Sequence, residues 1–262
     1  MTMKTLDPPA MLRFNFPGPR ADVSPEKIPR AFLTLAGMPS MRFRRHETNL
    51  PRNRFFADFC PDRQVVPMEL VHSREVFAVN SLPAGPVGDG IITVNPCLVP
   101  VITVADCMPI YLWEPSVFCF GVLHSGWRGT GIVLRAFDLG AEEYGANPRN
   151  FRVILGPHIQ ACCYTVEEDR AAYFARTFTP ECVEKAGDGQ WHLSLAKANI
   201  ALLKQAGVPP EHILCCPDCT CCDERFGSFR RQTAGLPDDM PLEEKSRHFT
   251  AMAAFAAFLP EV

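Results

Sequence analysis

Residues 117–131, VFCFGVLHSGWRGTG, run from an almost continuously apolar stretch into a glycine-rich turn. Such a stretch is typical of a strand that is buried on both faces. The turn leads into residues 132–145, IVLRAFDLGAEEYG, whose apolar spacing predicts a helix that ends at Gly145. This order of strand, turn and helix places the side chains of the turn at one end of a sheet.

Similar patterns occur on both sides of this stretch. Apolar runs predict further strands at residues 68–79, 151–157 and 212–217, and a strand, turn and strand over residues 91–104. Helical spacing predicts a helix at 167–178 and, after Ser194 as its N-cap, another at 195–206. Strands and helices are interleaved without the regular alternation of βαβ units, and several strands are joined by turns that suit antiparallel neighbours. We therefore predict an α+β fold with mixed sheets.

The two ends of the chain give different signals. Residues 1–60 are rich in Pro and Arg and show no sustained period, so they are predicted to form a loosely structured lead-in. Residues 246–259, SRHFTAMAAFAAFL, are alanine-rich and apolar nearly all round, which favours a helix packed into the body. No linker or internal repeat is visible, and we expect a single domain over residues 1–262.

Composition excludes several classes of protein. The chain has 262 residues, of which 47% are hydrophobic and 21% charged, so it can bury a substantial core. Its formal net charge of −3 lacks the basic excess of a general nucleic-acid or anionic-membrane binder. We find no export signal, and the late apolar run at 249–259 is shorter than a bilayer span. These features predict a cytoplasmic protein whose twelve cysteines are reduced.

Three potential metal ligands stand at the ends of predicted strands: His72, Cys107 and His124. Imidazole nitrogen and thiolate sulfur are ligands that Zn²⁺ prefers, and three protein ligands leave a fourth position for water or substrate. The same residues suit a metal-free nucleophile, with Cys107 as the thiolate, His124 as its base and Asp106 orienting the imidazole. A third interpretation is that these strand-end residues merely pack.

Several residues near the turn suit an anion or a flat ring. The start of the predicted helix points free N–H groups outward, and Arg128 adds a planar double donor. Trp127 suits stacking on a ring, or wedging the turn against the core. Arg54, in RNRFF, and Arg230, in GSFRRQ, are further anion-binding candidates, with a solvated surface charge as the alternative for each.

Residues 215–222, CCPDCTCC, hold five cysteines, with CxxC spacing at 216–219 and again at 219–222. A structural zinc site usually draws on two separated Cys pairs, whereas these thiols crowd into one short turn. We therefore expect burial or redox sensitivity here, and a second metal at residues 215–222 stays an open alternative.

Five segments are distinctive in their order and spacing: TVADCMPIYLW (103–113), GVLHSGWRGTG (121–131), VILGPHIQACCYTV (153–166), LSLAKANIALLKQAGV (193–208) and CPDCTCCDERFGSFRR (216–231). Together they resemble the YfiH-like family once called polyphenol oxidoreductase laccases. The resemblance covers a core of residues 51–262 and leaves 1–50 as a poorly matched lead-in. It implies two mixed sheets flanked by helices in four α/β/β/α layers, as in certain deamidating toxins.

The resemblance also implies a zinc site on His72, Cys107 and His124. Members of the family are associated with phosphorolysis of purine nucleosides and deamination of adenosine, and a bacterial member is linked to peptidoglycan editing. The chain departs from the family pattern at Leu70, Ser73, Thr165 and Ser194. Copper is disfavoured, because four-copper oxidases need about ten histidines in close clusters. This chain has seven histidines, and no two are close in sequence.

The leading hypothesis is a zinc-dependent purine nucleoside phosphorylase with adenosine deaminase activity. Its partners are then a purine nucleoside and phosphate, without nucleic acid or membrane, and it is expected to be a monomer or weak homo-oligomer. In this hypothesis Cys107, His124 and Asp106 are catalytic, and substrate is held by Arg54, Trp127, Arg128 and Arg230. Two alternatives stay open: a metal-free cysteine hydrolase or amidase acting on a peptidoglycan precursor, and a zinc-stabilised binding protein without enzymatic activity.

Overall fold

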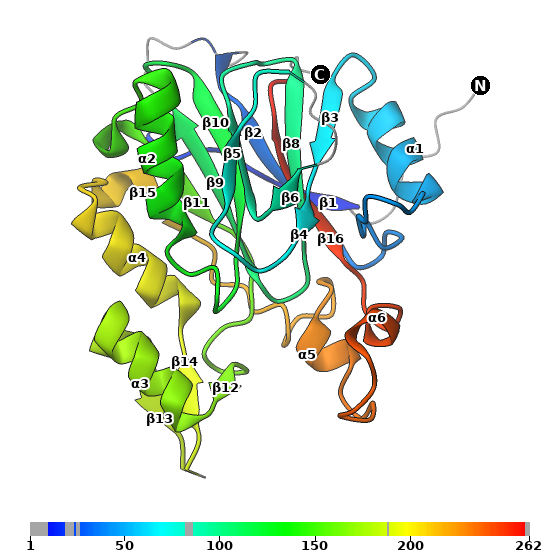
Figure 1. Cartoon of the computed structure of the whole chain (residues 1–262), viewed down its shortest axis with the longest axis vertical. Coiled ribbons are helices and arrows are strands. Elements are labelled where there is room, and N and C mark those ends of the chain that lie inside the picture. Colours follow the sequence, from blue (N-terminus) through cyan, green and yellow to red (C-terminus); the bar gives the residue numbers. More distant parts are fainter. Residues whose placement is uncertain (1–9, 19–23, 25–26, 82–85, 188, 260–262) are drawn as a thin grey trace.

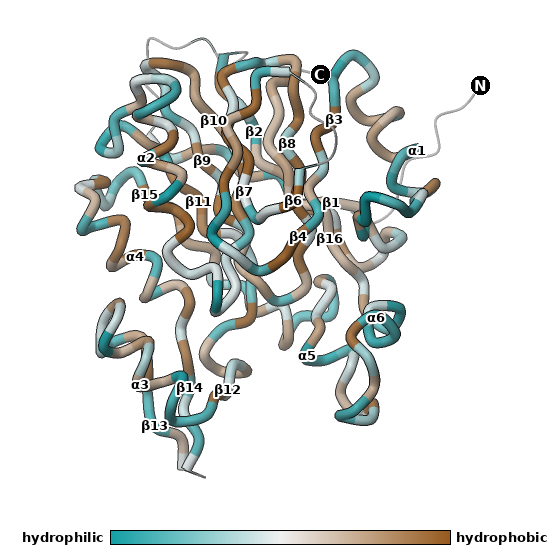
Figure 2. The backbone as a smooth tube through the Cα atoms, in the orientation of Figure 1, coloured by the Kyte–Doolittle hydropathy of each residue, from teal (hydrophilic) through white to brown (hydrophobic). Residues whose placement is uncertain are grey.

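The computed structural model describes residues 10–18, 24, 27–81, 86–187 and 189–259. Two mixed β-sheets stack face to face at its centre, and helices cover both outer faces (Figure 1). The hydropathy of the tube in Figure 2 follows this arrangement, because the central strands are mostly brown and the connecting loops mostly teal. The prediction of an α+β fold with paired mixed sheets is confirmed.

The larger sheet has six strands in the order β15-β11-β9-β10-β7-β5. They are β5 (Val76–Ala78), β7 (Gly90–Thr93), β9 (Met108–Glu114), β10 (Cys119–Ser125), β11 (Arg152–Leu155) and β15 (Ile213–Cys215). The strand predicted around residues 117–124 is therefore β10, and it lies between β9 and β7 with antiparallel pairing on both sides. Gly121 is required there, because a Cβ at this position would lie 2.1 Å from the carbonyl oxygen of Ile91.

The second sheet has five strands in the order β1-β2-β16-β8-β3. They are β1 (Met11–Phe14), β2 (Arg30–Thr34), β3 (Gln64–Pro67), β8 (Leu98–Val104) and β16 (Met252–Ala257). All pairs are antiparallel except β3 with β8. Two small sheets complete the fold. They are formed by β4 (Glu69–Leu70) and β6 (Val87–Gly88), and by β12 (Thr165–Val166), β13 (Val183–Lys185) and β14 (Trp191–Leu193).

The helices longer than one turn are α1 (Leu50–Phe59), α2 (Ile132–Tyr144), α3 (Glu168–Thr177) and α4 (Leu195–Gln205), and the short ones are α5 (Phe229–Gln232) and α6 (Leu242–Lys245). Of these, α1, α2 and α4 form the outer layers of the fold. Among the described residues, 3-10 turns span Pro148–Asn150, Pro180–Cys182 and Pro210–His212. The helix boundaries predicted from Gly145 and from Ser194 are confirmed, since both residues cap the helices as expected.

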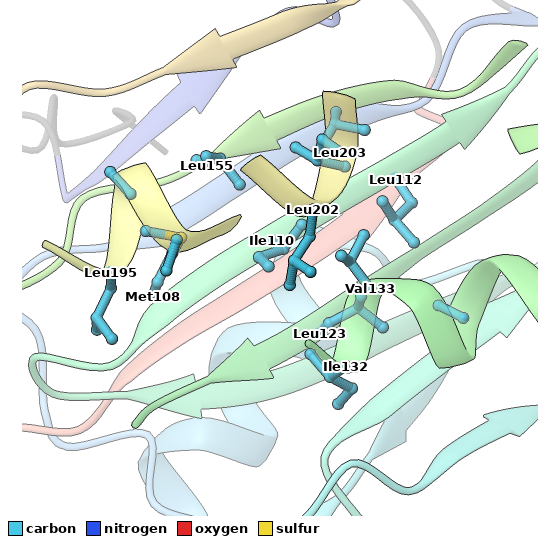
Figure 3. Close-up of a cluster of buried hydrophobic side chains, with 14 of the residues drawn as sticks. Met108, Ile110, Leu112, Leu123, Ile132, Val133, Leu155, Leu195, Leu202 and Leu203 are labelled. Atoms are coloured by element: carbon cyan, nitrogen blue, oxygen red, sulfur yellow. The ribbon is translucent and has the colours of Figure 1, made fainter. Parts of the chain in front are cut away.

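Alternating side chains of the strands separate the core into layers. Helices α2 and α4 pack on one face of the larger sheet, where Ile132 and Leu202 belong to one buried cluster with Ile110, Leu112 and Leu123 (Figure 3). Between the two sheets lies a second cluster that includes Tyr111, Trp113, Phe120, Ile102 and Ala254. The outer face of the five-stranded sheet packs on α1 through Phe32, Phe56 and Phe255. The four layers are thus α1, the five-stranded sheet, the six-stranded sheet, and α2 with α4.

The terminal helix predicted at residues 246–259 is wrong. Residues Met252–Ala257 form strand β16, which lies between β2 and β8 in the second sheet. Met252 and Ala254 face the other sheet, whereas Ala253 and Phe255 face α1. A strand buried on both faces needs no polar alternation, so its sequence is apolar all round, like that of a buried helix.

The loosely structured lead-in predicted for residues 1–60 is also wrong in large part. Strands β1 and β2 form one side of the second sheet, and α1 covers that sheet. Asn49 accepts a hydrogen bond from the backbone N–H of Arg52, and Pro51 stands in the first turn, so both helix-start signals were present in the sequence. Residues 1–9 lie outside the described part. The strand predicted over 68–79 is interrupted, because only Glu69–Leu70 and Val76–Ala78 are extended.

One buried histidine makes the stability of this fold sensitive to acid. Burial lowers the pKa of His158 to about 4, and its Nδ1 donates to the carbonyl of Gly156 at 2.8 Å. The neutral form therefore stabilises the fold fully above the unfolded pKa of about 6.5, and this stability is lost as the pH falls toward 4. Between pH 7 and pH 4, we expect the free energy of unfolding of His158→Gln, measured in urea, to fall by about 3 kcal/mol less than that of wild type. Equal slopes for the two proteins, both measured in chelator, would contradict this.

Candidate metal centre and active site

Three predicted ligands meet at one end of the larger sheet. His72 lies between β4 and β5, Cys107 immediately precedes β9, and His124 is near the end of β10. Their potential ligand atoms all lie within 4.8 Å of one another. The two imidazole rings are nearly perpendicular, at 84°, with centroids 4.9 Å apart. The fold thus brings together residues that are widely separated along the chain.

The register of two strands explains how Cys107 reaches this group. Met108 pairs with Ser125 across β9 and β10, so the next residues outward, Cys107 and Gly126, are neighbours. A Cβ on Gly126 would lie 2.8 Å from the sulfur of Cys107. Glycine at this position therefore leaves the space that the thiol occupies, and a larger residue would displace the thiol from the two histidines.

Asp89, which the sequence analysis did not single out, holds both histidines in place. Its carboxylate is fully buried and lies 2.8 Å from Nδ1 of His124. The same carboxylate accepts from the backbone N–H of His72 at 3.0 Å, and from the N–H and hydroxyl of Ser73 at 2.6 and 2.7 Å. Donation of the Nδ1 proton to Asp89 leaves Nε2 of His124 as the lone-pair donor, which is the tautomer that a metal ligand needs.

The charges of this group stabilise one another in the protein without metal. Burial opposes the thiolate of Cys107, but the charge and hydrogen bonds of His124 and His72 lower its pKa to about 6. Burial also opposes the imidazolium of His124, and Cys107 and Asp89 outweigh it and raise the pKa of His124. A thiolate is thus available near neutral pH, both as a metal ligand and as a nucleophile.

The donor set fits a zinc ion with an open position. Two imidazole nitrogens and one thiolate sulfur suit a borderline-soft cation, and three protein ligands leave a fourth site for water or substrate. A carboxylate that orients the second nitrogen of a ligating histidine is the usual companion of such ligands, and Asp89 has this place. His72 has a φ of 58°, a strained conformation for a non-glycine residue, which is fixed by the bonds to Asp89.

The three ligands line a cavity of about 420 Å³. Its apolar and aromatic lining comes from loops, from the end of β4 and from the starts of α4, α5 and α6, and includes Phe43, Leu70, Trp127, Ile159, Tyr164, Leu195, Phe229, Leu242 and Phe249. Arg230 supplies positive charge, whereas Arg42 and Arg44, which also line the cavity, are paired with Glu47, Glu243 and Glu69. Flat apolar walls beside a cation and a potential metal-ligand group suit a compact molecule that combines an aromatic ring with an anion.

The structure gives the predicted substrate-binding residues different positions. Trp127 and Arg230 line the cavity. Arg128 is exposed and lies over the Trp127 ring, 4.9 Å from its centroid, without lining the cavity. Arg54 is on α1 with a side chain 86% exposed, 3.8 Å from Asp58, and it is also outside the lining. The structure therefore brings two of the four to the ligand group.

Asp106 has a different role from the one predicted. Its carboxylate accepts from the hydroxyl of Thr220 at 2.7 Å and from the backbone N–H of Arg230 at 2.6 Å, whereas the orienting contact to His124 comes from Asp89. Asp106 has a φ of 86° and lies next to Cys107. It therefore connects the turn that carries Cys107 to the short helix that carries Arg230.

The departures from the family pattern have local roles. Ser73 bonds Asp89, Ser194 caps α4 by accepting from the N–H of Lys197, and Thr165 accepts from the Arg230 guanidinium at 3.1 Å. Leu70 adds to the apolar lining. Arg42 and Arg44 were missed because they lie in the segment predicted to be a loosely structured lead-in.

Asp89→Asn tests the orienting carboxylate. We expect the variant to bind zinc at the His72 group about 10–100-fold more weakly, because an amide holds the His124 tautomer less firmly than a carboxylate does. The measurement is competition with a chromophoric chelator. Asp58→Asn is the matched control, since Asp58 is exposed on α1. Equal zinc affinities for Asp89→Asn and wild type would remove Asp89 from this role.

Fold and site together define a class of protein: a four-layer α+β protein with a two-histidine, one-cysteine ligand group opening into a cavity. A family model described as multi-copper polyphenol oxidoreductase laccase matches residues 45–236. The chain belongs to this family, and the YfiH-like assignment is confirmed.

Known proteins with similar sequences and structures agree with this family assignment. A purine nucleoside phosphorylase from Geobacillus stearothermophilus is 37% identical over 149 residues, covering 55% of this chain and 54% of that protein. An adenosine deaminase from an unknown prokaryotic organism is 30% identical over 148 residues, covering 55% and 56%. The chain thus spans about half the length of the curated relatives it matches. The crystal structure of YlmD from Geobacillus stearothermophilus has a TM-score of 0.75 at 26% identity, over 93% of this chain and 98% of that chain.

In the described part of the chain, none of the helices combines the length and the apolarity that crossing a bilayer demands.

Proposed function

We propose that this protein is a zinc-dependent purine nucleoside phosphorylase with adenosine deaminase activity. The observation that carries the proposal is the His72, Cys107 and His124 group at a cavity with apolar, aromatic and cationic walls. Relatives named purine nucleoside phosphorylase and adenosine deaminase support the same reaction classes. Despite the family's name, the two potential metal-ligand groups among the described residues hold only two histidines, which does not suit a multicopper centre.

Different residues of the cavity suit different parts of the substrates. Phe229 and Phe249, whose rings meet edge to face with centroids 5.4 Å apart, form an aromatic wall that suits one face of a purine, and the cationic side chain of Arg230 suits phosphate. In phosphorolysis a phosphate oxygen bonds to C1′ of the ribose while the bond from C1′ to the base nitrogen breaks. In deamination water adds to C6 of adenine and ammonia leaves. Both reactions bring an oxygen nucleophile to a carbon of the nucleoside, C1′ of the ribose in one and C6 of the purine in the other, and we infer that the purine lies between the aromatic wall and the ligand group.

A bound Zn²⁺ supplies Lewis-acid chemistry, which polarises an oxygen and lowers the pKa of water toward neutrality. The residues around it fix the geometry. Asp89 accepts a hydrogen bond from the Nδ1–H of His124 and so keeps Nε2 directed at the ligand group. Asp106 accepts the backbone N–H of Arg230 and so positions the start of α5 beside the cavity.

Arg230 is the residue whose removal should most affect phosphate binding. We expect Arg230→Ala to raise the KM for phosphate about 10–100-fold with a smaller change in the KM for nucleoside, because a charge-assisted hydrogen bond contributes about 1.5–3 kcal/mol. Arg230→Lys should recover part of the loss. Steady-state kinetics with each substrate varied provide the measurement, and Arg135→Ala is the control, since Arg135 is exposed on α2 and outside the cavity lining. An unchanged phosphate KM in Arg230→Ala would refute this assignment.

A second candidate function rests on the interactions that link the side chains of Asp89, His124 and Cys107. Asp89 orients His124, and His124 lowers the pKa of Cys107, which is the arrangement of a cysteine hydrolase with a Cys-His-Asp set. In this alternative the protein is a metal-free amidase acting on a cell-wall precursor. It requires activity that survives complete metal removal and disappears when iodoacetamide modifies Cys107.

The proposed function is tested by one incubation. Protein of measured zinc content is mixed with adenosine, with and without phosphate, and adenine and inosine are followed by chromatography. Adenine formed only with phosphate supports the phosphorylase, and inosine supports the deaminase. Absence of both products from zinc-loaded protein would overturn the proposal in favour of the amidase or a binding protein.

A further inference from the structure

A second cluster of potential metal ligands lies outside the cavity. It consists of Cys162 and Cys163, from the loop between β11 and β12, and Cys219 and Cys222, from the loop between β15 and α5. The four sulfur atoms all lie within 4.8 Å of one another. The cluster shares no residue with the His72 group and contributes nothing to the cavity lining.

Sheet pairing brings the two loops together. Strands β11 and β15 are parallel neighbours, and an isolated bridge between His158 and Cys219 continues the pairing beyond the sheet. The cysteines therefore come as two pairs separated by more than fifty positions, on segments whose backbones are already hydrogen-bonded to each other. Two separated Cys pairs are the usual source of a structural zinc site. Cys216, which the sequence spacing paired with Cys219, is instead buried between the two sheets.

Three of the six sulfur–sulfur separations can be compared with the edges of a tetrahedral ion site, and the other three, which involve Cys219, are within 4.8 Å. With zinc–sulfur bonds of about 2.3 Å, the edges of a regular tetrahedron of sulfurs are about 3.8 Å long. The separations are 3.8 Å between Cys162 and Cys163, 3.6 Å between Cys162 and Cys222, and 3.2 Å between Cys163 and Cys222. Even the shortest is well beyond the roughly 2.05 Å of a disulfide bond, so the cluster has the dimensions of a metal site.

The surroundings of Cys219 suit a thiolate. The backbone N–H of Gln160 donates to the sulfur of Cys219 at 3.3 Å. The guanidinium of Arg231 donates to the carbonyls of Thr220 and Cys221 at 2.6 and 2.8 Å, which places a cation inside the same loop. N–H donors to sulfur and a nearby cation both favour thiolates, which are the form that binds metal.

We propose that Cys162, Cys163, Cys219 and Cys222 bind one Zn²⁺ as a structural tetrathiolate site, separate from the His72 group. Binding releases the thiol protons to solvent and changes no oxidation state. The ion would clamp two loops that support the cavity. One loop carries Ile159 and Tyr164, which line the cavity. The other carries Thr220, which bonds Asp106. The site is therefore a stabilising element and takes no part in the chemistry.

Zinc content and cobalt spectra test the proposal. We expect two zinc ions per chain in wild type by plasma mass spectrometry, one in Cys163→Ser/Cys222→Ser, and one in His124→Ala. Cobalt-loaded His124→Ala should then show the visible absorption of a tetrahedral tetrathiolate ion, and the double serine variant should lack it. Cys97→Ser is the matched control and should keep both ions, because Cys97 is exposed and outside the cluster. These readouts do not depend on nucleoside turnover, so they separate this proposal from the proposed function.

A measurement on wild type covers the case in which the serine variants do not fold. In native zinc-loaded protein, iodoacetamide should modify Cys97 and leave the four cluster thiols unmodified, whereas denaturation in chelator should expose all of them. Three results would overturn the proposal. They are unchanged zinc content in the double serine variant, alkylation of the cluster thiols at the rate of Cys97, and a disulfide within the cluster of protein purified under reductant.

Discussion

Cys107→Ala is expected to lose the metal of the cavity and at least about 10³-fold in kcat/KM for adenosine phosphorolysis. The thiolate is one of three ligands, and loss of the Lewis acid removes several kcal/mol of transition-state stabilisation. Zinc content and turnover should fall together, because the metal is required for the reaction. The cavity walls are left intact, so the loss of turnover is due to the loss of the metal. The measurement is the rate of adenine release in phosphate, with zinc analysis of the same sample.

The control for this variant is Cys97→Ala, which removes an exposed thiol remote from the ligand group. It should keep wild-type zinc content and turnover. Full phosphorolysis by Cys107→Ala would exclude both the metal centre and a cysteine nucleophile. Retained zinc with lost turnover would instead favour Cys107 as the reacting group.

Phe255→Ala should have the largest effect on stability. Phe255 is fully buried in β16, is stacked on Phe32 with centroids 5.0 Å apart, and also contacts Phe55, Phe56 and Phe59. Removing such a ring costs about 3–5 kcal/mol in free energy of unfolding, since the α1 layer cannot close the cavity that remains. Urea unfolding measures the loss.

Phe77→Ala makes the same chemical change at an edge strand, where the ring is 38% exposed. It should lower the free energy of unfolding much less than Phe255→Ala does. Equal losses in the two variants would mean that α1 and β16 do not form the packed layer described above.

The sequence predicted elements best where local signals were strong. Strand β10 and helix α2 follow from an apolar run, a glycine turn and the stop at Gly145. Strand β16 was mistaken for a helix because alanine favours helices and because burial on both faces removes the period of two. That burial comes from the packing of the sheet between α1 and the other sheet, and no local pattern encodes it.

The site was predictable to the same extent. His72, Cys107 and His124 could be identified as candidate ligands that the fold brings together, because few residue types bind zinc and each lies at a strand end. Asp89 could not, since its role depends on the pairing of β7 with β10, which places it beside His124. Likewise the cysteines at 215–222 were visible, but their partners, Cys162 and Cys163, are brought to them only by the pairing of β11 with β15.

The central claim is that the His72, Cys107 and His124 group carries purine nucleoside phosphorolysis through a bound zinc ion. The most direct test is to strip the protein with a chelator, confirm that its zinc is gone, and add Zn²⁺ back in steps with adenosine and phosphate present. The account predicts no adenine release from the stripped protein and a rate that rises with zinc until the cavity ligands are saturated. Full adenine release by the stripped protein would contradict it.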